Sequence, residues 1–455
     1  MYTRPAELGE RGSRAVSPRA GLRSYDAVTL LTGYVVVLLA IPSDRVVPAL
    51  GGAGSPSVWF GLGAFLWWCW YQLQRQRTSP GWSNPVRLSV FIFLGAVLAS
   101  YIAAMTRPIS LEEANAADLG LIKLVGWAGV LLLTVDGVPN ADRFIVLLRR
   151  LTFAGALMAA LGLLQFALGQ SLVDAISIPG LSSTQEYSSV QERSGFPRAA
   201  GTAMHPLEYA AVLSVIFPVA LTLALHEPQR RMMSRWLPPM LILLALALSS
   251  SRSGLLGLVI GIVVLFPTWS AKIRAWATAA AVALAGAIYV LVPGMVGTLR
   301  DLFTNVSNDP SALSRTSSYE LVLEFFERNP LFGRGFGTFL PVYRILDNEW
   351  LLLLMDVGLI GVAAVLGMVA ASAASALLGR RAATGDLLRA LGPALTASVL
   401  AGAVLAASFD AFSFPMAGGT FFLACGLCGA YWSVTVSHTT SAATTAVGAP
   451  IAAES

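Results

Sequence analysis

The acids best placed for chemistry lie between Ser314 and Gly361, the most polar long stretch of a largely apolar chain. Asp347 and Glu349 stand where this stretch enters an apolar run, and Asp356 lies seven residues after Glu349, on the same helix face. A carboxylate beside a hydroxyl can accept its proton as a general base. We expect Asp347 to act in this way, with Glu349 as the alternative. The competing interpretation is that the acids pair with Arg334, Arg344 or Arg252 and hold the stretch in place.

Two arginines are candidates for binding phosphate. Arg252 lies in Ser251-Arg252-Ser253, between two short apolar runs. A charge below the membrane surface needs an anionic partner, although an interfacial arginine can also reach the lipid headgroups. Arg198 precedes another apolar run, and guanidinium groups bind phosphates with a fork of N–H donors. The two together could hold a diphosphate. His205 is followed by a proline, which suits a helix start, so a structural role competes with a catalytic one.

Several mechanisms lack their usual motifs. The chain has no P-loop, no H-E-x-x-H and no G-x-S-x-G. We therefore expect no metal and no cofactor. The net charge of +5 is spread over short links, which argues against a nucleic-acid partner. An enzyme that faces away from the cytoplasm has no ATP and needs an activated substrate, for which a lipid diphosphate is the natural choice.

The scaffold must be a membrane bundle. Of the residues, 56% are hydrophobic and only 12% are charged, whereas soluble proteins carry roughly 25% charged residues. The fold class predicted is all-α, a polytopic membrane helix bundle with about twelve transmembrane helices. The expected helices are 27–48, 56–73, 86–105, 119–135, 143–168, 206–225, 236–250, 253–267, 273–292, 347–371, 387–408 and 412–434.

The basic residues predict the orientation of the bundle. Most of the 30 lysines and arginines fall on one side of it, which the positive-inside rule assigns to the cytoplasm. This predicts a cytoplasmic tail at 1–26, a transmembrane domain at 27–437 and a disordered cytoplasmic tail at 438–455. Two long links, 169–205 and 293–346, then lie on the outer side, where long links are often functional.

The second long link should form a partly helical cap between the ninth and tenth helices. Ser317-x-x-Glu320 has the pattern of a capping box, and an apolar stripe with a Glu324–Arg328 pair follows. Asn329-Pro330 should end this helix. Glycines around Arg334 then allow a sharp turn.

Five short motifs resemble the O-antigen ligase and O-antigen polymerase superfamily. N-P-L-F-G-x-G-F-G-x-F (329–339), D-N-E-W-L (347–351) and D-x-G-L-I-G (356–361) together resemble its C-terminal pattern. R-A-A-G-T-A-M-H-P (198–206) and S-R-S-G (251–254) resemble its other two marks, in the same order.

The resemblance implies a metal-independent, inverting glycosyltransferase with the C-type membrane fold, in the bacterial cytoplasmic membrane. Such enzymes pass a glycan from undecaprenyl diphosphate to an acceptor hydroxyl, on a glycan or a lipid, at the outer face. Arg198 and Arg252 match the arginines that hold the diphosphate. The expected supporting residues are His205, Arg334, Asn348 and Asp356.

One position departs from the family. Ligases typically carry His before the Asn, as the proposed catalytic group, whereas this chain has Asp347. The change argues against a lipopolysaccharide ligase and leaves a polymerase or a ligase of another surface glycan open. A transporter is the alternative from another class, although no inverted repeat supports it. A cell-wall glycan polymerase of the rod-shape and division type is a third interpretation, against which the N-P-L-F-G-x-G-F-G pattern argues.

Overall fold

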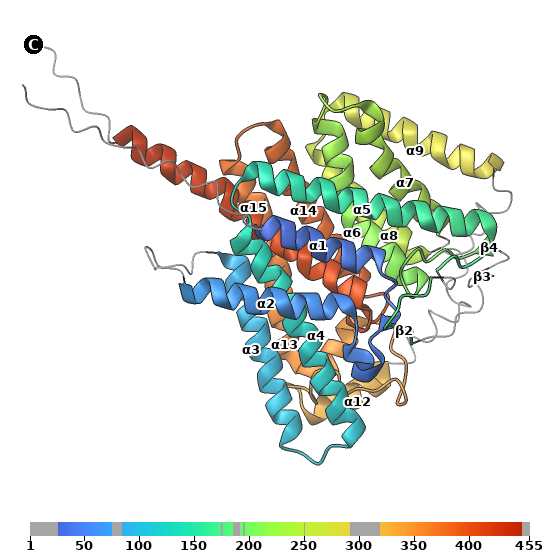
Figure 1. Cartoon of the computed structure of the whole chain (residues 1–455), viewed down its shortest axis with the longest axis vertical. Helices are drawn as coiled ribbons and strands as arrows, with labels where there is room; N and C mark the ends of the chain where they lie inside the picture. The colour runs from blue at the N-terminus through green and yellow to red at the C-terminus, as the bar shows by residue number, and fades with distance from the viewer. Residues whose placement is uncertain are drawn as a thin grey trace, which may run out of the picture.

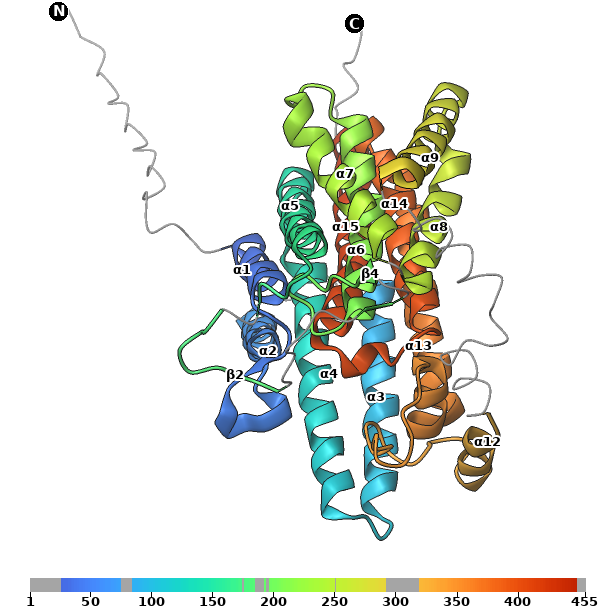
Figure 2. The ribbon, with the colours of Figure 1, turned by 90° about the vertical axis from the view of Figure 1, so that its right-hand side faces the viewer.

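A computed structural model describes residues 26–74, 84–173, 176–184, 192–193, 196–249, 251–291 and 319–447 of the chain. These residues form a bundle of long helices (Figures 1 and 2). In this part of the chain, strands occur only as two short antiparallel pairs, β1 (Arg45–Val46) with β2 (Ser182–Ser183) and β3 (Glu192–Arg193) with β4 (Phe196–Pro197). The all-α class is confirmed.

Each apolar segment predicted from the sequence corresponds to a helix. The long helices are α1 (Ala27–Ala40), α2 (Pro56–Gln74), α3 (Pro85–Met105), α4 (Leu111–Gly137), α5 (Ala141–Leu168), α6 (Pro206–His226), α7 (Met232–Leu248), α8 (Arg252–Leu265), α9 (Ala271–Leu291), α13 (Glu349–Ala382), α14 (Asp386–Leu405) and α15 (Pro415–Val447). Seven helices in the described residues are long and apolar enough to cross a membrane: α3, α4, α5, α6, α13, α14 and α15. The count of twelve spans stays a prediction.

The first helix is shorter than predicted. It ends at Ala40 rather than near residue 48, and Ile41 has an extended backbone. Ile41 precedes Pro42, and the residue before a proline is sterically disfavoured in a helix. The link that follows contains the short 3₁₀ helix η1 (Pro48–Ala53).

The links predicted on the outer side meet at one end of the bundle. The link between α1 and α2 pairs through β1 with β2, which lies between α5 and α6. The backbone N–H of Glu349, at the start of α13, donates to the carbonyl of Ala406, just after α14. The cap residue Arg334 pairs with Glu113 of α4. Which side of a membrane this end faces stays a prediction.

The predicted cap helix is present. The helix α12 (Tyr319–Arg328) lies beside α13 in Figure 2. Arg328 bonds to Glu324 at 2.6 Å, as expected from their spacing. The apolar stripe is also present, since Val322 is buried with Phe339 of the cap and Met355 of α13. Ser317 of the expected capping box lies outside the described residues.

The helix α13 is broken at Gly358, whose φ of 64° is left-handed. Met355 and Asp356 offer carbonyls that the break leaves without partners from their own helix. Instead, the N–H of Arg334 donates to Met355 at 2.9 Å and that of Gly335 donates to Asp356 at 2.8 Å. The glycine-rich loop of the cap (residues 330–339) therefore supplies N–H donors to carbonyls that have no partner within α13.

The same loop also accepts hydrogen bonds from the second half of α13. The N–H of Leu359 donates to Pro330 at 2.9 Å, and that of Ile360 donates to Leu331 at 3.2 Å. Loop and helix thus complete each other's backbone hydrogen bonds on both sides of the break.

Candidate functional site

The candidate site lies where α6, α13 and α15 begin, around the link 406–414 between α14 and α15. Asn348 caps α13, because its Oδ1 accepts from the N–H groups of Trp350 (3.0 Å) and Leu351 (3.3 Å). Asn348 is therefore a structural residue that fixes where the helix starts and so where its two acidic neighbours stand.

Glu349 connects α13 to this link. Its backbone N–H donates to Ala406 and Phe409, and its Oε2 accepts from the N–H of Phe412 at 2.9 Å. The residue is only 4% exposed. A carboxylate held in this way is a poor choice for a base that must meet a substrate, whereas the neighbouring Asp347 is half-buried and more accessible.

Asp347 belongs to a group of charges from three elements. Burial is the largest cause that raises the pKa of Asp410, in the link 406–414, and the negative charge of Asp347 acts in the same direction, while the hydroxyl of Ser413 and the ammonium of Lys123 oppose the rise; the resulting pKa is about 6. Lys123 lies on α4, one of the seven helices that are long and apolar enough to cross a membrane. Asp410 is therefore close enough to feel both the charge of the predicted base and the charge of Lys123.

His205 caps α6, as one of the two competing interpretations predicted. Its Nδ1 accepts from the N–H of Leu207 at 3.2 Å. Its ring packs against Phe414 with centroids 5.9 Å apart. Burial lowers the pKa of His205 to about 4, and the nearby cation of Arg198 lowers it too. The imidazole is therefore neutral at physiological pH, and Arg198 lies beside it.

Glu208 joins the pieces around His205. This fully buried carboxylate accepts from the hydroxyl of Ser43 (2.7 Å), the N–H of Met204 (3.0 Å) and the N–H of Met416 (2.9 Å). It thereby ties the link after α1 and the first turns of α6 and α15 together. Three segments far apart in sequence are therefore joined by a single side chain.

Arg252 is the first residue of α8. Ser251 caps the helix by accepting from the N–H of Gly254 at 3.3 Å. The first turn of α8 packs on α6: a Cβ placed on Gly254 would lie 2.9 Å from the Cβ of Ala210. Arg252 therefore begins its helix beside the early turns of α6. The predicted break between the seventh and eighth helices is confirmed, because α7 ends at Leu248.

Arg334 and Asp356 support the cap. The guanidinium of Arg334 pairs with Glu113 and lies over the rings of Phe325 (4.9 Å) and Tyr343 (5.3 Å). Its ion-pair partner is thus on α4 and not among the acids of the 314–361 stretch. Asp356 accepts from the N–H groups of the glycine-rich loop.

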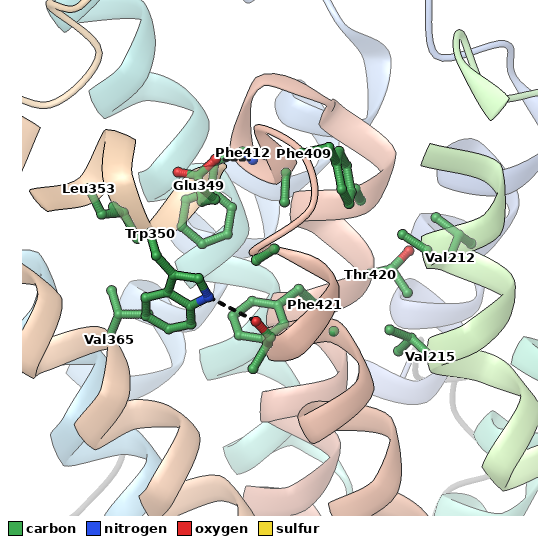
Figure 3. Close-up of a pocket in the computed structure, with 16 residues that line it drawn as sticks. Val212, Val215, Glu349, Trp350, Leu353, Val365, Phe409, Phe412, Thr420 and Phe421 are labelled. Carbon is green, nitrogen blue, oxygen red and sulfur yellow. Dashed lines mark hydrogen bonds between the residues drawn. The ribbon is translucent and has the colours of Figure 1, made fainter. Parts of the chain in front are cut away.

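An apolar cavity lies beside the site (Figure 3). Glu349 is the only one of the predicted site residues that lines it, and the N–H of the Trp350 indole donates to Ala403 at 3.0 Å. Trp350 and Val365 both line this cavity, although a straight helix would separate them by roughly 22 Å. The break at Gly358 therefore bends α13 around it.

Sequence reasoning missed three charged residues here. Lys123 and Glu208 lie inside predicted membrane helices, where any charge indicates a functional or paired group; this signal was available for both. Asp410 carried no such signal, because its neighbours Asp347 and Lys123 are distant in sequence.

One comparison with known proteins identifies part of the chain. The family model described as O-antigen ligase matches residues 239–366. This segment belongs to the O-antigen ligase family. The O-antigen ligase segment runs from α7 into α13 and holds Arg252, Asp347 and Glu349, whereas Arg198 and His205 precede it. No curated protein matches the chain. The family and the apolar helices indicate a multi-pass membrane protein with a glycan-transfer role in polysaccharide assembly.

Proposed function

We propose that this protein transfers or polymerises a glycan from undecaprenyl diphosphate onto an acceptor hydroxyl, at the outer face of the bacterial cytoplasmic membrane. Both termini would lie in the cytoplasm. One observation carries the proposal: two groups of charged and polar side chains lie around the link 406–414. The first is the acid–cation group of Asp347, Asp410 and Lys123, and the second is Arg198 with His205. The O-antigen ligase segment contributes Asp347 to the first group.

The diphosphate would bind to Arg198 and Arg252. Arg198 precedes α6, and Arg252 is the first residue of α8. The early turns of these two helices pack on each other. Helix N-termini carry unpaired N–H groups and a partial positive charge, so they favour an anion in the same place as the guanidinium groups. No metal ion is required in this scheme, because the arginines meet the charge.

The acceptor hydroxyl would be bound under the cap and lose its proton to Asp347. The acceptor oxygen forms a bond to C1 of the sugar while the bond from C1 to the phosphate oxygen breaks, and the diphosphate leaves with the electron pair. Attack from the face opposite the leaving group inverts C1. Charge grows on the leaving oxygens, where arginines already in place stabilise the transition state.

The test is a strain that lacks the protein, complemented with single variants and examined for lipid-linked and surface glycans. We expect Arg252→Ala to lose about 10²–10³-fold in transfer rate while still being inserted. The matched control is Arg274→Ala, which removes an exposed arginine at the start of α9. Normal glycan amount and length in Arg252→Ala would contradict the proposal.

The same strain separates the remaining alternatives. Single glycan units left on the lipid would indicate a polymerase, and long chains left on the lipid would indicate a ligase. No change in any glycan would contradict the transfer function and favour transport.

A further inference from the structure

The imidazole of His205 has one nitrogen occupied by the fold and one that is available. Nδ1 accepts the hydrogen bond from Leu207 and so must keep its lone pair. In a neutral imidazole the proton then resides on Nε2, which is a donor. The helix start therefore fixes the tautomer of this side chain.

The Nε2–H group is free to meet a ligand. Within the described part of the chain it makes no hydrogen bond, and it is not among the polar atoms that the protein encloses. The ring is held on one side by Phe414. A donor that has no hydrogen-bond partner among the described residues thus stands at the candidate site.

The electrostatic surroundings keep this donor neutral, and the nearby cation of Arg198 favours an anion as its ligand. Arg198 lies close enough to lower the pKa of His205, in addition to the effect of burial. A second cation beside Arg198 would be repelled, whereas a neutral N–H adds a hydrogen bond without that repulsion. Glu208, the nearest acid on the same helix, is occupied by three hydrogen bonds from Ser43, Met204 and Met416.

We propose that His205 binds a phosphate oxygen of the lipid diphosphate through Nε2–H, as a neutral donor beside the guanidinium of Arg198. This inference rests on the proposed function. Because negative charge grows on that oxygen as the bond to C1 breaks, the hydrogen bond strengthens in the transition state. His205 is thus a binding residue as well as a helix cap.

Two substitutions separate the cap from the donor. His205→Asn keeps a good helix cap but is too short to place a donor where Nε2 stands. His205→Gln loses the cap, and its amide N–H reaches about as far as the imidazole. We expect the Asn variant to retain thermal stability and lose about 10- to 100-fold in kcat/KM, measured with a polyprenyl-diphosphate-linked glycan. The Gln variant should be less stable and more active than the Asn variant.

The control is His226→Asn, the same change at the other end of α6, where Nδ1 lies 3.1 Å from the carbonyl of Thr222. It should leave activity unchanged. If His205→Asn is as active as the unchanged protein while Arg252→Ala is inactive, His205 is only a cap and the inference fails while the proposed function stands. If Arg252→Ala is also fully active, the proposed function itself fails. Should the Asn variant not fold, His205→Ser provides a second cap without the donor.

Discussion

The carboxylate of Asp356 accepts a hydrogen bond of 2.7 Å from the backbone N–H of Gly337, a residue of the cap. Its other oxygen accepts from the N–H of Phe339 at 3.3 Å. Together with the backbone bonds on both sides of Gly358, these contacts join the glycine-rich loop and the broken helix into one unit. The position of Asp347 at the head of that helix therefore depends on the loop.

Gly358→Ala should destabilise the protein. The left-handed φ of 64° disfavours any side chain, and a Cβ would also clash with the carbonyl oxygen of Leu331. We expect a loss of about 1–3 kcal/mol in the free energy of unfolding, measured by thermal unfolding in detergent.

Gly367→Ala is the matched control, because it lies in the same helix and a Cβ there meets nothing within 4 Å. It should be neutral or slightly stabilising. Equal behaviour of the two alanine variants would show that the break is not a fixed part of the fold.

Glu113→Gln should loosen the cap. Glu113 is buried and pairs with Arg334 and Arg107 (3.1 Å) while accepting from Tyr343 (2.8 Å). Removing its charge leaves the mostly buried guanidinium of Arg334 without its counter-ion, which costs about 3–5 kcal/mol for buried pairs. A double-mutant cycle with Arg334→Met measures the coupling, and the double variant should be less destabilised than the sum of the single variants. Additive effects would mean that this pair does not hold the cap.

Asp410→Asn should stabilise the protein at neutral pH and not in acid. Since the pKa is raised to about 6, the stabilising protonated form is present in full below the ordinary value near 4 and is lost as the pH rises through about 6. Asn imitates the protonated acid, so we expect a gain on the order of 2 kcal/mol at pH 7.5 and none at pH 4. Thermal unfolding at the two pH values checks this, and a gain of the same size at both would contradict it.

Asp347→Asn should remove the base and keep the shape of the side chain. We expect glycan transfer to fall by about 10²–10⁴-fold with little change in thermal stability. Asp347→His, the residue that ligases of the family carry, should recover part of that loss, because imidazole is also a proton acceptor. An Asn variant with an undiminished rate would exclude Asp347 as the base and leave Glu349 as the alternative.

Much of the helical framework follows from the sequence, because apolar length and charge act locally. The helix α12, its Glu324–Arg328 bond and its end at Arg328, just before Asn329-Pro330, follow from residues within and directly after one helix. The break between α7 and α8 also follows from the short apolar runs on either side of Arg252. Each of these features is decided by residues close together in the chain.

The partners of the charged residues could not be predicted in the same way. Arg334 pairs with Glu113, 221 residues earlier, and the pKa of Asp410 is affected by Lys123 of α4, which is also distant in sequence. Such pairs depend on which helices pack together, which periodicity does not reveal. Asp356 lies seven residues after Glu349, and its role comes from a loop that folds back onto the break.

The exchange of backbone hydrogen bonds at Gly358 also sets an order of assembly. The carbonyls of Pro330 and Leu331 accept hydrogen bonds from the N–H groups of Leu359 and Ile360, which are synthesised later. The glycine-rich loop can therefore complete these hydrogen bonds only after the following helix has been made. A chain that stops short of that helix would leave the loop without the backbone against which it folds.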